Sequence, residues 1–257
     1  MVQKKVRMTK LSIIIPVYNE AGTVGQLLDN VNKVSLPGIE KEIIIIEDNS
    51  RDGSRRIVKA FAKNHKGVSL ILRSKGLGKG SAVIEGFKKI TGQIVLIQDA
   101  DLEYDVADYS KLLKPILENK TDFVLGSRHM RKDGEINWSI RKFKGKDRLT
   151  AYLMNIGGGL FHKFFNLVYG VNLTDPTTMY KVFRSKLLKE VHFEGRFFEL
   201  DWEIVSKFIR KGHPPIEVPV KYESRGFAEG KKVNFFRDVY RWLIMIIKVR
   251  LLPISDL

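Results

Sequence analysis

The stretch Ile94-Val95-Leu96-Ile97-Gln98-Asp99-Ala100-Asp101 joins four apolar residues to two closely spaced carboxylates. A short, uninterrupted apolar run is typical of a strand that is buried on both faces of a parallel sheet. Asp99 and Asp101 then stand at the end of that strand, where they can share one divalent cation and a diphosphate. Hard oxygen ligands suit Mg²⁺ or Mn²⁺. The alternative is an acidic turn or helix N-cap that holds no ligand.

Similar apolar runs flank this strand at regular intervals. We expect strands at Leu11–Val17, Ile43–Ile46, Val68–Leu72, Ile94–Ile97 and Phe123–Leu125. Helices are expected between them at Ala21–Lys33, Ser54–Asn64, Lys79–Ile90 and Val106–Glu118. This alternation predicts an α/β fold with a mostly parallel central sheet and helices on both faces. In such sheets, ligands bind beyond the carboxyl ends of the strands.

The ends of the other predicted strands are also polar. They read Pro16-Val17-Tyr18-Asn19-Glu20, Glu47-Asp48-Asn49-Ser50, Ser74-Lys75-Gly76 and Gly126-Ser127-Arg128. These residues should converge on one edge, where a purely structural sheet would not need so many carboxylates. Asp48 can accept hydrogen bonds from a base or a ribose, but it also suits an Asx-type turn. Both interpretations of Asp48 stay open here.

A glycine-rich segment, Gly76-Leu77-Gly78-Lys79-Gly80, follows the third strand and opens a helix. Its backbone N–H groups and the Lys79 ammonium can hold phosphate, or the segment is a plain flexible turn. It does not match the P-loop order, in which Gly-Lys is followed at once by Ser or Thr. The chain also has no Gly-x-Ser-x-Gly elbow, no cysteine and no metal-ligand spacing among its five histidines.

The second half of the chain departs from this alternation. Arg128–Arg148 is predicted to be a mobile basic loop, and Leu149–Tyr169 a helix that Gly157-Gly158-Gly159 should kink or break. An amphipathic helix is expected at Phe198–Arg210 and a short strand at Ile216–Tyr222.

Charged residues stand at two places in this half. Glu199, Asp201 and Glu203 begin the Phe198–Arg210 helix, where they either favour the helix dipole or supply a general base or an acceptor-binding carboxylate. Arg225 and Lys231 follow the last strand. They either grip a diphosphate or an acceptor phosphate, or belong to a solvated loop.

The charge balance indicates anionic partners. The chain has 45 Lys and Arg against 29 Asp and Glu, a formal net charge of +16. Such a surplus favours phosphorylated substrates, nucleic acid or an anionic membrane surface. No apolar window reaches the roughly 18 residues expected of a spanning helix. The lack of cysteine fits a reducing compartment. We therefore expect a cytoplasmic protein that lies on the membrane face without crossing it.

The last predicted helix, Phe235–Leu252, carries an apolar stripe flanked by Lys and Arg. The stripe comprises Phe235, Phe236, Val239, Trp242, Leu243, Ile246 and Ile247. This pattern is typical of an interfacial helix on anionic lipid. It is also typical of an amphipathic helix that packs on the core of its own domain.

The ordered motifs together resemble family 2 glycosyltransferases, and more narrowly the polyprenyl-phosphate sugar synthases of the dolichol-phosphate mannose synthase type. The resemblance covers roughly residues 11 to 232. It is carried by Ile13–Glu20, Glu47–Ser54, Gly76–Gly80, Asp99–Leu102 and Gly126–Arg128. It implies a GT-A fold, with residues 1–232 as the catalytic domain and 233–257 as a C-terminal amphipathic, interfacial helix. No counterpart of the C-terminal membrane-spanning helices of many members is expected.

The resemblance also implies roles for single residues. The expected nucleotide-binding residues are Pro16, Tyr18, Glu20, Asp48, Gly78, Lys79 and Asp99. Asp101 and Glu103 would hold Mg²⁺ or Mn²⁺. The family often has Gln in place of Glu103, so this extra carboxylate either strengthens metal binding or points away. Asp175–Tyr180 resembles the segment that lines the donor sugar.

The implied reaction is an inverting displacement at the anomeric carbon of a nucleotide-diphosphate sugar. The expected catalytic residues are Asp101, Asp201, Arg225 and Lys231, and the expected acceptor-phosphate residues are Arg128, Arg225 and Lys231. The Gly and Ser that the family places between Arg225 and Lys231 are not kept here. A polyprenyl (dolichyl or undecaprenyl) phosphate acceptor is already ionised near neutral pH. A saccharide hydroxyl, the alternative acceptor, would need a general base such as Asp201.

Two other classes fit the motifs less well. A sugar-1-phosphate nucleotidyltransferase would carry a glycine-rich loop after its first strand, where this chain has Pro16–Glu20. A non-enzymatic nucleic-acid or membrane-binding module would account for the charge, but not for carboxylates at successive strand ends. We therefore expect no nucleic-acid partner.

Overall fold

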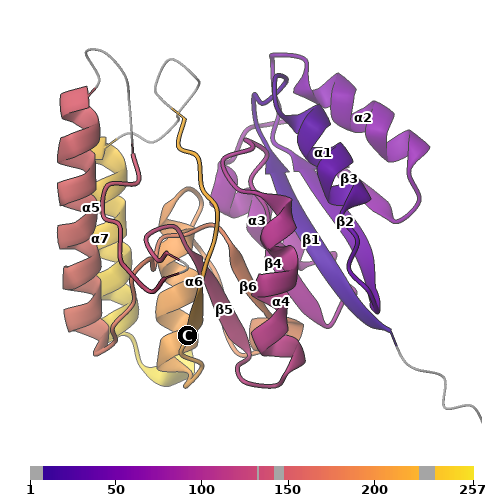
Figure 1. Cartoon of the computed structure of the whole chain (residues 1–257). Coiled ribbons are helices and arrows are strands. Elements are labelled where there is room, and N and C mark those ends of the chain that lie inside the picture. Colours follow the sequence, from indigo (N-terminus) through magenta and orange to yellow (C-terminus); the bar gives the residue numbers. More distant parts are fainter. Residues whose placement is uncertain (1–7, 132, 142–147, 226–234) are drawn as a thin grey trace, which may run out of the picture.

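The computed structural model describes residues 8–131, 133–141, 148–225 and 235–257, which form an α/β fold around one sheet (Figure 1). Within these ranges the strand order is β3-β2-β1-β4-β6-β5-β7. The strands are β1 (Thr9–Val17), β2 (Ile39–Glu47), β3 (Val68–Leu72), β4 (Ile94–Ile97), β5 (Phe123–Ser127), β6 (Lys181–Arg184) and β7 (Ile216–Pro219). The α-helices are α1 (Val24–Lys33), α2 (Ser54–Asn64), α3 (Lys79–Phe87), α4 (Tyr109–Leu117), α5 (Arg148–Tyr169), α6 (Glu199–Arg210) and α7 (Phe235–Leu251). The predicted α/β class is confirmed.

The parallel register of the first strands brings their carboxyl ends to one edge. Val17, the last residue of β1, pairs with Glu47, the last residue of β2. Ile97, the last residue of β4, pairs with Ile14 of β1. The chain leaves all three strands at this edge because they run in the same direction. The polar strand ends that the sequence singled out therefore lie next to one another.

Strand β6 was not predicted from the sequence. It runs antiparallel between β4 and β5, and β7 lies parallel to β5. Four residues without a marked pattern give too weak a signal for a strand, and β6 is defined by its neighbours. Lys181, the first residue of β6, is fully buried and pairs with Asp201 of α6 at 3.5 Å.

The helices form unequal layers. In Figure 1, α1 and α2 lie at one side of the molecule, whereas α5 and α7 stand side by side at the other. Helix α6 lies between the sheet and this pair. Phe208 of α6 packs on Phe123 and Phe183 of the sheet, and Trp202 packs on Phe161 of α5 and Trp242 of α7. Helix α6 is therefore enclosed on several sides.

Helix α5 runs without a break through Gly157-Gly158-Gly159, so the expected break is absent. The glycines leave room for side chains of the preceding segment. A Cβ atom on Gly158 would lie 3.5 Å from Nη1 of Arg141, and one on Gly159 would lie 3.8 Å from the ring of Trp138. Packing on this segment and on α6 outweighs the low helix propensity of glycine.

Helix α7 packs on the core with part of the stripe that the sequence suggested for a membrane. Ile246 is fully buried, and Trp242 contacts Trp202 and Phe161. The exposed apolar residues of α7 are Ile247, which belongs to the stripe, and Tyr240, Ile244 and Leu251, which do not. Helix α7 is thus apolar on two faces. Within the described ranges, every helix is too short or too polar to span a bilayer.

Candidate active site

A cavity of about 510 Å³ opens at the carboxyl edge of the sheet. The sequence-predicted site residues that line it are Pro16, Tyr18, Glu20, Asp48, Gly78, Lys79, Asp99, Asp101, Glu103, Arg128, Asp201 and Arg225. Lys231 lies outside the described residues. The volume of the cavity falls within the range of roughly 300–1,000 Å³ that is usual for small-molecule sites. Residues from seven separate segments of the sequence thus meet at one site.

Asp48 shapes the glycine-rich loop. Its Oδ1 accepts a hydrogen bond from the backbone N–H of Leu77 (3.0 Å), and its Oδ2 accepts one from the N–H of Gly78 (2.9 Å). The guanidinium of Arg73 forms an ion pair with the same carboxylate at 3.0 Å. The Asp48 carboxylate thus holds the glycine-rich loop rather than an Asx-type turn, and a contact between Asp48 and a base or ribose stays a prediction. The carboxylate lines the cavity and also holds the loop that borders it.

The glycine-rich loop is packed too tightly for side chains. Gly78 has a φ of +96°, and a Cβ atom on Gly80 would lie 2.4 Å from the carbonyl oxygen of Gly195. Lys79, between them, pairs with Asp99 at 2.7 Å. Burial lowers the pKa of Lys79, but Asp99 and other nearby carboxylates outweigh this effect and raise it overall. Lys79 therefore brings a fixed positive charge to the cavity.

Asp101 stands in the most acidic part of the site. Burial, followed by the charges of Asp99 and Glu103, raises its pKa to about 7. Its Oδ2 accepts a hydrogen bond from Nη2 of Arg225 at 3.1 Å. Arg225 also bonds both carboxylate oxygens of Glu20, at 2.9 and 3.1 Å. Crowded carboxylates of this kind fit a divalent cation, which supplies the positive charge that oxygen ligands require.

Glu103 connects this cluster to the segment after β7. Its Oε2 accepts a hydrogen bond from the hydroxyl of Tyr222 (2.7 Å), and its Oε1 accepts one from the backbone N–H of Arg225 (2.8 Å). The structure therefore places Glu103 beside Asp101 but gives its oxygens partners in the Tyr222–Arg225 segment. This is a role that the sequence comparison with the family's Gln did not suggest.

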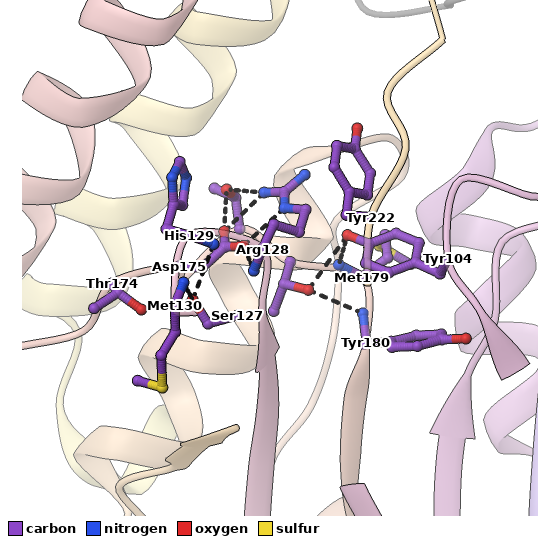
Figure 2. A network of polar contacts seen from close by, with 12 residues as sticks. Tyr104, Ser127, Arg128, His129, Met130, Thr174, Asp175, Met179, Tyr180 and Tyr222 are labelled. Atoms are coloured by element: carbon purple, nitrogen blue, oxygen red, sulfur yellow. Dashed lines mark hydrogen bonds and ion pairs between the residues drawn. The ribbon is translucent and has the colours of Figure 1, made fainter. Parts of the chain in front are cut away.

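Arg128 reaches the cavity from the end of β5 and is held by Asp175 (Figure 2). Its Nε and Nη2 each lie 2.7 Å from a carboxylate oxygen of Asp175, and its guanidinium carbon lies 5.2 Å from the centre of the Tyr222 ring. Asp175 is fully buried, and the nearby Arg128 holds its pKa well below the ordinary value despite the opposing effect of burial. Asp175 thus orients Arg128, while Thr177 and Met179 of the same segment line the cavity.

Two histidines meet beside this ion pair. His129, His162 and Asp175 offer ligand atoms within 4.8 Å of one another, which their sequence spacing did not reveal. Nδ1 of each histidine lies near a backbone carbonyl oxygen, that of Asn137 at 2.9 Å and that of Thr174 at 3.1 Å. Both oxygens of Asp175 already accept hydrogen bonds from Arg128, whereas Arg225 bonds Asp101 through Oδ2. We therefore place the candidate metal site at Asp99, Asp101 and Glu103 rather than at these histidines.

Asp201 lies near the base of the cavity, 3.5 Å from Nζ of Lys181. Burial raises the pKa of Asp201, although Lys181 and Lys79 act in the opposite direction. Its neighbours on α6 have structural partners. Glu199 accepts hydrogen bonds from the backbone N–H groups of residues 196 and 197, and Glu203 pairs with Lys207 at 2.9 Å. Of the three acidic residues, only Asp201 lines the cavity in the part of the chain that the structure describes.

Three further cavity residues carry buried donors that have no hydrogen-bond partner among the described residues. They are Nε of Arg141 and Nε1 of both Trp202 and Trp242. Arg141 also donates from Nη1 to the carbonyl oxygen of Met154 at 3.3 Å. Sequence reasoning placed Arg141 only within a basic loop, because nothing local distinguishes it from the other cations there. Unpaired donors favour a ligand that is rich in acceptor oxygens.

Comparison with solved structures identifies the class of fold. Glucosyl-3-phosphoglycerate synthase from Mycobacterium tuberculosis, in complex with Mn²⁺, uridine diphosphate and phosphoglyceric acid, has a TM-score of 0.68 at 15% identity, with 95% of this chain and 80% of that chain covered. Mannosyl-3-phosphoglycerate synthase from Rubrobacter xylanophilus has a TM-score of 0.64 at 18% identity, with coverage of 94% and 72%. The chain has the GT-A fold of glycosyltransferases.

Residues 12–192 match the family model described as glycosyl transferase family 2. The chain belongs to this family. It is 28% identical to dolichol-phosphate mannosyltransferase from Pyrococcus furiosus over 238 residues, which are 90% of this chain and 63% of that protein. It is 27% identical to undecaprenyl-phosphate 4-deoxy-4-formamido-L-arabinose transferase from Edwardsiella ictaluri, over 86% of this chain and 62% of that protein. It is 26% identical to undecaprenyl-phosphate mannosyltransferase from Micrococcus luteus, with 85% of each chain covered. The chain therefore spans less than two thirds of the first two relatives.

The buried histidine pair predicts a dependence of stability on pH. Burial lowers the pKa of His162 from its ordinary 6.5 to about 3. The stability that a neutral His162 contributes is present above pH 6.5 and is lost progressively as the pH falls towards 3. We expect His162→Gln to show a smaller fall in melting temperature than the wild type between pH 7 and pH 4.5, measured by circular dichroism. His65→Gln, outside the cavity, is the control and should follow the wild type. An equal fall in melting temperature for the wild type and His162→Gln would contradict a contribution of neutral His162 to stability.

Proposed function

We propose that this protein is a metal-dependent, inverting glycosyltransferase that moves a sugar from a nucleotide-diphosphate sugar to a polyprenyl phosphate at a membrane surface. One observation carries the proposal: every described residue that was predicted individually to bind nucleotide, metal or acceptor phosphate lines the same cavity. Family 2 membership supports sugar transfer. The relatives named as dolichol-phosphate and undecaprenyl-phosphate sugar transferases support a lipid-phosphate acceptor.

The donor would lie along the ends of β1, β2 and β4. We assign the base and ribose to the part of the cavity near Pro16, Tyr18 and Asp48, and the diphosphate to the part near Gly78 and Lys79. Asp99, Asp101 and Glu103 would hold Mg²⁺ or Mn²⁺, as the complexes of the solved Mycobacterium tuberculosis enzyme with Mn²⁺ or Mg²⁺ and uridine diphosphate support. When bound, such a cation offsets the negative charge that develops on the leaving diphosphate.

The acceptor phosphate would lie between Arg128 and Arg141. Both line the cavity on the side of α5, and the unpaired Nε of Arg141 offers a donor to a phosphate oxygen. Charge-assisted N–H donors of guanidinium groups bind phosphate oxygens well. A phosphate monoester carries about −1.5 to −2 charge at pH 7. Its oxygen can therefore attack the anomeric carbon without a general base, so these arginines need only orient it.

A saccharide hydroxyl remains the second candidate acceptor, and one observation favours it. Asp201 lines the cavity with a raised pKa, which makes its carboxylate a better proton acceptor at neutral pH. Lys181 pairs with this carboxylate and would keep it in place. The names of the relatives and the cluster of arginines weigh more for a phosphate acceptor.

Two exposed apolar rows suggest how the cavity meets a membrane. Helix α5 exposes Leu149, Tyr152, Leu153, Ile156, Leu160 and Leu167, and α7 exposes Tyr240, Ile244, Ile247 and Leu251. Both helices also line the cavity, α5 through Met154 and Phe161 and α7 through Val239 and Trp242. An apolar surface on these helices, with Lys and Arg nearby, fits the interface of an anionic bilayer. A lipid acceptor held there would lie close to the site.

The metal assignment yields a direct test. Asp101→Asn keeps the size of the side chain but removes the charge that a divalent cation needs. We expect sugar transfer to fall by at least about 100-fold, the scale of losing one electrostatic stabiliser of the transition state. We also expect loss of the Mn²⁺-dependent part of nucleoside diphosphate affinity in calorimetry. Asp105→Asn, on the turn that follows, is the matched control. Retention of the metal dependence in Asp101→Asn would refute the assignment.

The membrane surface can be tested without disturbing the core. Leu153 is 57% exposed and Leu160 is 62% exposed, so Leu153→Gln/Leu160→Gln should leave the fold intact. We expect this double variant to co-sediment less with liposomes that contain phosphatidylserine, and salt to release the wild type in part. Leu117→Gln, on α4 with 44% exposure, is the control. Unchanged sedimentation of the α5 variant would argue against this surface.

A further inference from the structure

The segment Tyr222–Arg225 places a guanidinium among the carboxylates of the candidate metal site. Nη2 of Arg225 lies 3.1 Å from Asp101, and its two terminal nitrogens bond both oxygens of Glu20. Glu103 holds the same segment at two points. Its carboxylate accepts a hydrogen bond from the Tyr222 hydroxyl, and the backbone carbonyl oxygen of Glu103 accepts one from the N–H of Glu223 at 2.9 Å. Arg225 is therefore fixed from several directions.

Arg225 and a divalent cation require the same oxygen atoms. The Asp101 oxygen that accepts from Arg225, Oδ2, is one of the two oxygens that this side chain can offer to a cation. The side chains of Arg225, Asp101 and Glu103 are 19%, 15% and 11% exposed, so solvent screens this competition only in part. A positive charge that already neutralises these carboxylates weakens the binding of a second one.

Arg225 has a second potential partner in the donor. A nucleotide diphosphate carries acceptor oxygens and negative charge, which guanidinium groups bind well. The cavity that Arg225 lines also contains Gly78 and Lys79, where we place the diphosphate. If Arg225 moved from Asp101 to the diphosphate, it would leave the carboxylates free at the moment when the donor arrives.

We propose that Arg225 is the resident counter-cation of the metal site, and that it exchanges Asp101 for the diphosphate when metal and donor bind together. This inference rests on the proposed function, because it uses the metal and donor sites assigned there. It assigns to Arg225 two opposite effects: in the absence of nucleotide it opposes the metal, and in its presence it supports the diphosphate. A residue that only binds phosphate would lack the first effect.

The test is calorimetric titration with MnCl₂ in the absence of nucleotide. We expect Arg225→Gln to bind Mn²⁺ more tightly than the wild type, within the roughly 5- to 150-fold range of typical coupling between sites. In the presence of Mn²⁺, the same variant should bind uridine or guanosine diphosphate more weakly. The control is Arg184→Gln, which removes the same charge at the opposite end of the sheet, where Arg184 pairs with Asp122 at 3.0 Å. It should match the wild type in both titrations.

Further comparisons distinguish a failure of this inference from a failure of the proposed function. Arg225→Met removes the charge and keeps a long side chain, so it should bind Mn²⁺ more tightly than the wild type even if Arg225→Gln fails to fold. Mn²⁺ affinity of the Arg225 variants that is no higher than that of Arg184→Gln would overturn the inference, while loss of Mn²⁺ binding in Asp101→Asn would still support the metal site. Mn²⁺ binding that survives in Asp101→Asn would overturn both.

Discussion

The guanidinium of Arg225 joins Glu20, at the end of β1, to Asp101, at the end of β4, and the organisation of the site depends on this contact. Parallel strands bring several carboxylates to one edge, where they repel one another unless cations lie between them. In the structure, Arg225 and Lys79 provide such charges. Burial and then the same repulsion raise the pKa of Asp101, and the repulsion explains why this edge suits a divalent cation.

The proposed acceptor side of the cavity is built on a different principle. Asp175 holds Arg128 by two hydrogen bonds below the surface, and the glycines of α5 leave space for Arg141. Phe161 and Trp202 line the same cavity as these arginines. Cationic groups beside an aromatic and apolar wall suit a ligand with a charged head and a hydrocarbon tail. The exposed rows of α5 and α7 continue this apolar character to the outside of the molecule.

The convergence of the proposed donor-side residues on one cavity could be predicted from the sequence because strand ends follow directly from local patterns. Asp48, Asp99 and Asp101 each come after an apolar run, and parallel order then places them together. The remainder depends on contacts between distant segments. Strand β6 is defined by β4 and β5, His129 and His162 meet only in the fold, and Glu103 is held by Tyr222. Likewise, the continuity of α5 through three glycines reflects packing that no local propensity contains.

The identity of the acceptor can be tested with one transfer assay. The protein is incubated with Mn²⁺ and a panel of radiolabelled nucleotide-diphosphate sugars, together with undecaprenyl or dolichyl phosphate in liposomes or with soluble saccharides. With a lipid-phosphate acceptor, we expect label from one donor to move into the organic phase only when the lipid phosphate is present, and mild acid to release it as free sugar. Label that passes only to the soluble saccharides would exclude a lipid-phosphate acceptor and would favour Asp201 as a general base.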